Sequence, residues 1–184
     1  MKTILQVEDD PNDVLFLQHA MNKAGLANPI RVASDGQGAI DYLQGVGKFA
    51  DRDQFPFPSL VLLDLKLPDV MGLDVLKWIR QQSGMNLVVL LLTASKRESD
   101  LEAAYRLGAN GFLLKPCEAT ELQDMVKAIG EFWLTHNLLP KVSPRANGDP
   151  LPPTSPNAKR SRPVTNVEAA RNVTWLEWTS GGGN

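Results

Sequence analysis

The amino-acid sequence predicts an α/β domain in which a parallel sheet is covered by helices on both faces. Within the first 140 of the 184 residues, short apolar segments alternate five times with amphipathic segments. Two of the apolar segments, 60–63 and 87–92, contain no polar residue, which is typical of strands buried on both faces of a parallel sheet. Right-handed crossovers between such units produce a doubly wound sheet.

Each strand is predicted from a short, mainly apolar run between turn-forming or charged residues. The first strand contains Gln6, whose side-chain amide needs hydrogen-bond partners if it is buried. The predicted strands span residues 4–7, 30–33, 60–63, 87–92 and 111–114.

The first helix is predicted to begin at Pro11, because Asp10 suits an N-cap and proline suits the first helical position. Asp13 resembles the acidic half of a capping box. Apolar residues then recur at helical spacing in four later segments. These further helices are predicted at about 36–44, 71–82, 98–107 and 118–135.

The last predicted helix carries an apolar stripe with two apolar residues beside it. Phe132 and Leu134 lie off the stripe, so they are either exposed at an interface or packed beneath the following segment. The stripe consists of Leu122, Met125, Val126, Ile129 and Trp133.

The composition changes at Pro140, which divides the chain into a domain at 1–140 and a tail at 141–184. The tail is rich in Pro, and its first part, 141–163, contains too little apolar surface to offset its ordering entropy, so we expect disorder. The end, 164–179, contains two tryptophans. It is open to two interpretations, a short partner-binding motif or an unstructured tail.

The overall composition argues against several classes of protein. A net charge of −2 gives no signal for nucleic acid. The first residues do not resemble a signal peptide, and no apolar stretch is long enough to span a membrane, so we expect a cytoplasmic protein. The single cysteine, Cys117, excludes an intramolecular disulfide.

Charged and hydroxyl side chains follow four of the predicted strands. Glu8 and Asp9 follow the first strand, Asp64 the third, Thr93 the fourth and Lys115 the fifth. In a doubly wound sheet the carboxyl ends of the strands share one edge, where ligands bind. We therefore expect these five side chains to converge, although each one taken singly fits an ordinary turn, cap or solvated loop residue.

The predicted cluster suits metal-assisted phosphoryl transfer. Three neighbouring carboxylates repel one another unless a cation neutralises them, and Mg²⁺ prefers oxygen ligands while retaining waters. A carboxylate can act as a nucleophile toward phosphorus. An ammonium and a hydroxyl group can hold the transferred phosphoryl oxygens.

In four segments the chain resembles the receiver domains of two-component response regulators. The resemblance covers roughly 1–136 and implies a flavodoxin-like sheet with strand order 2-1-3-4-5. The ending at 131–134, followed by Leu139 and Pro140, is similar to single-domain regulators that serve phytochrome kinases. The matching segments are 4–11 (ILQVEDDP), 62–68 (LLDLKLP) with Gly72, 92–94 (LTA) and 108–116 (GANGFLLKP).

The resemblance implies a phosphoacceptor and a metal site. Asp64 would accept a phosphoryl group from the phosphohistidine of a sensor histidine kinase. Asp9, Asp64 and the backbone carbonyl of Lys66 would ligate Mg²⁺ directly, and Glu8 would act through water.

The resemblance also assigns residues that hold the phosphoryl group and respond to it. Lys115 would pair with the group, while the backbone at Lys66 and the N–H of Ala94 would contact it. Thr93 would move toward the group, and Phe112 would rotate inward.

These observations favour a phosphoacceptor with no separate enzyme activity, whose output passes through contacts with a downstream protein or a second copy of the chain. Binding to DNA is not expected. An aspartyl-phosphate phosphatase would carry a second aspartate two residues after the nucleophile, where this chain has Lys66. The remaining alternative is a scaffold that acts through the tail, for which Asp64→Asn would leave partner binding unchanged.

Overall fold

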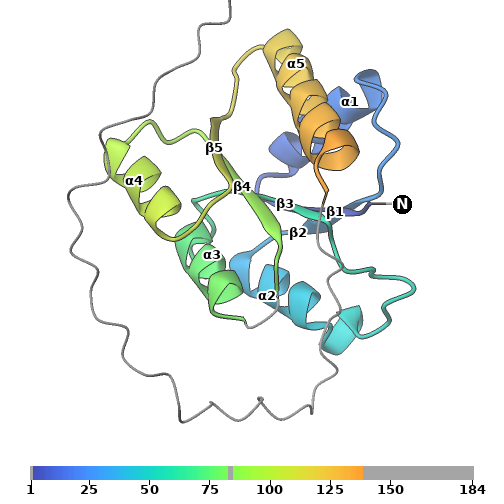
Figure 1. The fold of residues 1–184 in the computed structure, drawn as a ribbon, viewed down its shortest axis with the longest axis vertical. Coiled ribbons are helices and arrows are strands. Elements are labelled where there is room, and N and C mark those ends of the chain that lie inside the picture. Colours follow the sequence, from blue (N-terminus) through green and yellow to red (C-terminus); the bar gives the residue numbers. More distant parts are fainter. Residues whose placement is uncertain (1, 83–84, 139–184) are drawn as a thin grey trace, which may run out of the picture. The chain divides into compact units, whose positions relative to one another are not determined.

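A computed structural model describes residues 2–82 and 85–138. Its centre is a five-stranded parallel sheet with the order β2-β1-β3-β4-β5 (Figure 1). This arrangement confirms the predicted fold class and strand order. The fourth strand begins and ends one residue later than predicted. The strands are β1 (Ile4–Val7), β2 (Ile30–Ala33), β3 (Leu60–Leu63), β4 (Val88–Thr93) and β5 (Gly111–Leu114).

Helices cover both faces of the sheet, as Figure 1 shows. One face is covered by α1 (Pro11–Lys23) and α5 (Ala119–Ile129). The other is covered by α2 (Gly36–Gln44), α3 (Gly72–Gln81) and α4 (Glu98–Arg106), with a short 3₁₀ turn, η1 (Gly47–Phe49), after α2.

The hydrophobic core has one layer on each face of the sheet. All residues of β1, β3 and β4 are buried, because alternate side chains of each strand point to opposite faces. In β1, Leu5 and Val7 join the layer beneath α2 to α4, and Ile4 joins the layer beneath α1 and α5. The core therefore holds the central strands rigidly and leaves their polar ends at the edge.

The first helix begins as predicted, but one part of its cap differs. The Asp10 carboxylate accepts a hydrogen bond of 2.8 Å from the Asn12 N–H, and Pro11 is the first helical residue. The expectation that Asp13 completes a capping box is wrong. The Asp10 N–H instead lies 3.5 Å from the Glu8 carboxylate, and the Asp13 side chain reaches Lys115.

The last helix is not one continuous α-helix over 118–135. It ends at Ile129 and continues as a wider π-helical segment, η2 (Gly130–His136), in which the Asn137 N–H donates to the Phe132 carbonyl. Gly130 packs so closely on Leu26 that a Cβ would overlap it, and glycine lowers the preference for a regular helix.

The wider turn changes which side chains of η2 face the core. Phe132 is 55% exposed, as predicted for a residue beside the stripe. Leu134 packs against the core layer together with Trp133. The expectation that Leu134 lies off the core stripe is therefore wrong, since a π-helix has more residues per turn than the assumed α-helix.

Within the described residues, none of the helices combines the length and apolar character needed to cross a membrane. The boundary at Pro140 and the expectations for 141–163 and 164–179 lie outside the described residues.

We expect Gly72→Ala to destabilise the fold by about 1–3 kcal/mol, the usual cost of overpacking. A Cβ at Gly72 would overlap the backbone carbonyl of Asp64, which cannot move away as a flexible side chain does. Urea unfolding measures the loss.

The matched control is Gly111→Ala, whose Cβ would lie 3.0 Å from the end of the Leu90 side chain. That contact can relax by rotation of Leu90, so the control should lose less stability. Equal losses in the two variants would contradict the assigned role of Gly72.

Candidate functional site

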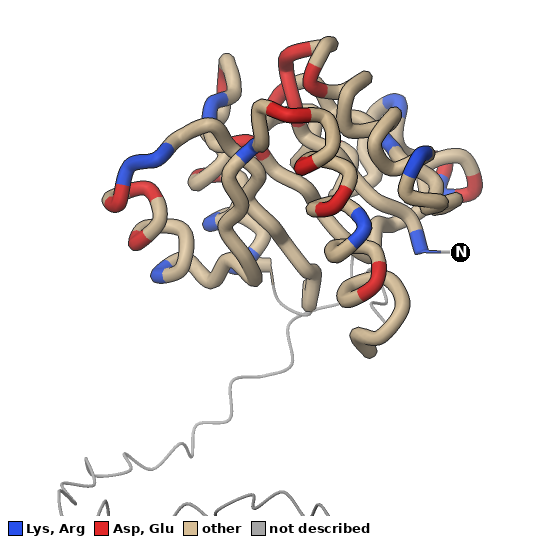
Figure 2. The backbone as a smooth tube through the Cα atoms, turned by 90° about the horizontal axis from the view of Figure 1, so that it is seen from above, with Lys and Arg blue, Asp and Glu red and all other residues tan. Residues whose placement is uncertain are grey.

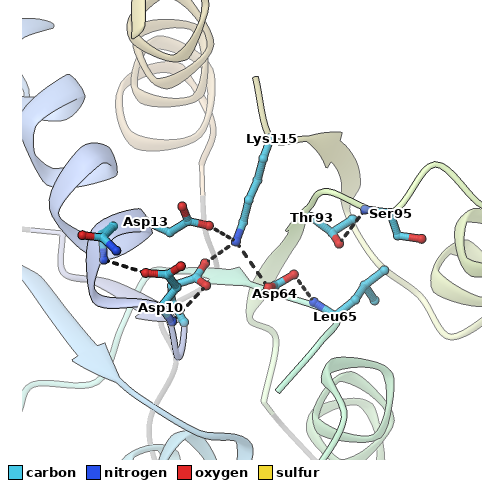
Figure 3. Close-up of polar contacts among 9 residues, drawn as sticks. Asp10, Asp13, Asp64, Leu65, Thr93, Ser95 and Lys115 are labelled. Carbon is cyan, nitrogen blue, oxygen red and sulfur yellow. Dashed lines mark hydrogen bonds and ion pairs between the residues drawn. The ribbon is translucent and has the colours of Figure 1, made fainter. Parts of the chain in front are cut away.

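The polar residues at the strand ends meet at one edge of the sheet. Glu8 and Asp9 follow β1, Asp64 follows β3, Thr93 ends β4 and Lys115 follows β5. Figure 3 shows the Lys115 side chain reaching across to Asp64, with Thr93 on the neighbouring strand. Figure 2 shows several acidic positions close together at the upper edge of the view, with basic positions dispersed elsewhere.

The carboxylates form a cluster suited to a divalent cation. Ligand oxygens of Glu8, Asp9 and Asp64 all lie within 4.8 Å of one another. Glu8 and Asp64 are only 5% and 8% exposed, whereas Asp9 is exposed. Hard oxygen donors with one side open to water fit a small divalent cation that retains part of its hydration.

Lys115 supplies the positive charge that the cluster needs. Its Nζ lies 2.6 Å from Glu8 Oε2, 2.7 Å from Asp13 Oδ2 and 3.3 Å from Asp64 Oδ2. Burial alone would lower the pKa of the ammonium, but the hydrogen bonds to Asp13 and Glu8 and the charge of Asp64 raise that pKa above its ordinary value. Lys115 therefore stays charged.

Glu8 occupies the most buried position of the cluster. Burial raises the pKa of its carboxyl group, and the hydrogen bond and positive charge of Lys115 partly oppose that increase. The charge on Glu8 thus depends on its neighbours, and the ammonium or a metal ion favours the ionised form.

Asp64 is held in a defined orientation at the end of β3. Its Oδ1 accepts a 2.6 Å hydrogen bond from the Leu65 N–H, and its Oδ2 faces Lys115. The close approach of Gly72 fixes the backbone at the same position. One carboxylate oxygen is therefore fixed by the backbone, and the other is directed toward the Lys115 ammonium.

The Thr93 hydroxyl is buried and engaged with the connection that follows β4. Its Oγ1 accepts a 3.1 Å hydrogen bond from the Ser95 N–H. Ser95 Oγ in turn lies 2.5 Å from Asp100 on α4. These contacts link the predicted switch residue to the start of α4 through two hydrogen bonds.

The other predicted positions lie around this centre. Lys66 and Ala94 are exposed in the connections after β3 and β4. Phe112 is half-buried in β5 and packs against the core layer beneath α2 to α4.

Gln6 is buried at 3% exposure beside the cluster. Its Oε1 has no hydrogen-bond partner among the described residues. It lines a small cavity of about 60 Å³ together with Glu8, Asp13 and Lys115, which has room for water to satisfy the amide.

The sequence reasoning did not identify Asp13 as part of the site. Asp13 lies on the first turn of α1, and its spacing from Asp10 suits a capping box equally well. Only the position of Lys115 distinguishes the two roles. The Ser95–Asp100 contact was also missed, since a serine and an aspartate near a helix start carry no specific signal.

Comparison with known proteins defines the family. Residues 4–127 match the response regulator receiver domain. The chain therefore belongs to the response regulator receiver family.

Individual relatives show which members of that family the chain resembles. It is 35% identical over 140 residues to the response regulator Rcp1 of Synechocystis sp., covering 76% of this chain and 93% of Rcp1. The Mn²⁺-bound form of Rcp1 superposes with a TM-score of 0.68, covering 76% of this chain and 99% of that one.

Two further solved structures are similar to this chain along most of their length. The response regulator RPA3017, from red light signaling of R. palustris, has 33% identity and a TM-score of 0.73, covering 76% and 99% of the two chains. The phosphorylated cyanobacterial phytochrome response regulator RcpA has 33% identity and a TM-score of 0.70, covering 76% and 98%. The similarity to single-domain, phytochrome-associated regulators is thus confirmed.

We expect Lys115→Gln to lower the free energy of unfolding by about 2–3 kcal/mol, because it removes the counter-charge from partly buried carboxylates. A divalent cation should stabilise this variant more than wild type, since the ammonium no longer competes for the carboxylates. Urea unfolding with a chelator and with the cation measures both effects.

Lys127→Gln serves as the control, because Lys127 is 61% exposed and lies 4.0 Å from Glu131. Its stability should stay within about 0.5 kcal/mol of wild type. A cation effect on Lys115→Gln no larger than on wild type would contradict the assigned competition.

Proposed function

We propose that the protein is a Mg²⁺-dependent phosphorylation switch in which Asp64 accepts a phosphoryl group from the phosphohistidine of a sensor histidine kinase. One observation carries the proposal. The Asp64 carboxylate, oriented by the Leu65 N–H, lies 3.3 Å from the Lys115 ammonium and belongs to a carboxylate cluster of metal-binding dimensions.

The transfer follows from this geometry. A carboxylate oxygen of Asp64 forms a bond to phosphorus as the bond from phosphorus to the imidazole nitrogen breaks. The imidazole leaves with the electron pair and takes up a proton from solvent. Lys115 holds a phosphoryl oxygen and balances the charge that accumulates on it.

The residues present fit a magnesium ion. Asp9 and Asp64 would ligate it together with the backbone carbonyl of Lys66, and Glu8 would act through water. When bound, the ion neutralises charge on the carboxylates and on the phosphoryl oxygens. The Mn²⁺-bound form of Rcp1 supports a divalent cation at this type of site.

The response would pass through Thr93 and Phe112. The Thr93 hydroxyl would leave the Ser95 N–H and donate to a phosphoryl oxygen, with the Ala94 N–H and the backbone at Lys66 as further contacts. The half-buried Phe112 ring would then turn inward beside β4. Because Ser95 is joined to Asp100, movement of Thr93 would be transmitted to α4.

A sensor kinase and a downstream protein would be the partners of this switch. Similarity to RcpA and Rcp1 supports a kinase of the phytochrome type. The output would pass to a downstream protein and not to DNA. Transfer would occur in the cytoplasm, where ATP charges the kinase. The chain would have no enzyme activity besides its own phosphorylation and dephosphorylation.

A second copy of the chain is the proposed partner of the surface at α4, β5 and η2. Each of these elements exposes at least one large apolar side chain, and exposed apolar residues often mark interfaces. The exposed side chains are Leu101 and Tyr105 on α4, Leu114 on β5 and Phe132 on η2.

Incubation with acetyl phosphate and Mg²⁺ tests the phosphoryl transfer. We expect wild type to gain the mass of one phosphoryl group, and we expect no gain for Asp64→Asn or after chelation of the metal. Asp10→Asn is the control, because asparagine preserves the helix cap. Intact-protein mass spectrometry gives the result, and an unmodified wild type or a modified Asp64→Asn variant would overturn the proposal.

Size-exclusion chromatography with light scattering tests the self-association. Leu114→Arg should abolish any dimer, because it places a charge within the apolar surface. Val32→Arg should not, since Val32 is also exposed but lies in β2 at the opposite edge of the sheet. A dimer that persists in Leu114→Arg would rule out this surface.

A further inference from the structure

Asp13 contacts the ammonium that the proposed reaction uses. Its Oδ2 lies 2.7 Å from Lys115 Nζ, closer than the 3.3 Å between that nitrogen and Asp64. Figure 3 shows Asp13 and Asp64 on opposite sides of the ammonium. The side chain of Asp13 comes from the first turn of α1 and does not belong to the carboxylate cluster of metal-binding dimensions.

The hydrogen bonds of Lys115 leave no donor free. A lysine ammonium has three N–H groups, and the carboxylates of Glu8, Asp13 and Asp64 accept all of them. A phosphoryl oxygen on Asp64 therefore binds the ammonium only when one of these carboxylates releases it.

The three carboxylates differ in how easily they release the ammonium. The Asp64 side chain, 11% exposed, loses its own negative charge when its oxygen bonds to phosphorus, so the charge that needs the ammonium passes to the phosphoryl oxygens. The Glu8 side chain is 5% exposed, and its separation from Lys115 would leave a buried charge without a partner. The Asp13 side chain is 38% exposed, and water can solvate its carboxylate. Asp13 is thus the partner that a phosphoryl group displaces at the lowest cost.

We propose that Asp13 is a positioning residue that competes with the phosphoryl group for the Lys115 ammonium. This inference rests on the proposed phosphorylation of Asp64 and assigns that site a further regulating residue. Before transfer, Asp13 draws the ammonium toward α1, so its contact with Asp64 is longer than its contact with Asp13, and Asp64 is freer for the metal ion. The carboxylate of Asp13 also binds the ammonium again when the phosphoryl group leaves.

Two opposite effects of Asp13→Asn follow. Without the Asp13 charge, the ammonium is drawn toward Asp64 and Glu8, so Mg²⁺ meets a stronger competitor and binds more weakly. An anion on Asp64 meets an ammonium that is no longer held elsewhere, so it binds more tightly. Simple damage to the site would weaken both ligands.

Calorimetric titration tests these effects without a covalent step. The first titrant is Mg²⁺ alone, and the second is beryllium trifluoride at saturating Mg²⁺. This anion becomes tetrahedral when a carboxylate oxygen coordinates the beryllium, and it then mimics a phosphoryl group on Asp64. The variants are Asp13→Asn, Asp13→Glu and Asp10→Asn. The last removes a nearby charge that does not contact Lys115 and retains a residue suited to the helix cap.

Relative to Asp10→Asn, we expect Asp13→Asn to weaken Mg²⁺ binding about threefold and to tighten beryllium trifluoride binding about threefold, as for a partly exposed ion pair. Asp13→Glu should return both affinities toward wild type. Equal affinities in Asp13→Asn and Asp10→Asn, or weaker binding of both ligands, would overturn the inference. The Mg²⁺ titration decides it even if wild type binds no phosphoryl mimic, a result that would instead refute the proposed function.

Discussion

The ammonium of Lys115 among three carboxylates is the interaction on which the site depends. It joins residues that are 107, 102 and 51 positions away along the chain, namely Glu8, Asp13 and Asp64. Without this charge, the carboxylates would repel one another, and burial already raises the pKa of the Glu8 carboxyl group. The same contacts hold the ends of β1 and β3 and the start of α1 against the connection after β5. The ion pairs of Lys115 therefore both balance the charge of the carboxylates and fix the local structure.

The rest of the fold serves to hold these groups in place. Strands β1, β3 and β4 are buried along their whole length, and a close-packed core gives their ends little freedom. Gly72 lets the backbone approach Asp64 closely, and the Leu65 N–H orients its carboxylate. The proposed response to phosphorylation would therefore pass through the polar connections, above all the one that joins Thr93 through Ser95 to α4.

The features that depend on local pattern were predicted from the sequence. Continuous apolar runs located the strands, and Asp10 with Pro11 marked the start of α1, because strand burial and capping act over a few residues. Strand order came from the family resemblance. The role of Asp13 and the inward turn of Leu134 were not predicted. The first depends on a lysine about a hundred residues away, and the second on a π-helical turn where Gly130 packs on Leu26.

The central claim is that Asp64 carries the phosphoryl group, and chemical trapping of the acyl phosphate tests it most directly. Borohydride reduces an aspartyl phosphate to an alcohol, and peptide sequencing by mass spectrometry then locates the reduced residue in protein treated with acetyl phosphate and Mg²⁺. The account predicts reduction at position 64 alone, since that carboxylate is oriented by the Leu65 N–H and faces Lys115. Reduction at Asp9 or Asp13 would contradict the account. It would also be contradicted if the protein gained the mass of a phosphoryl group and no aspartate were reduced.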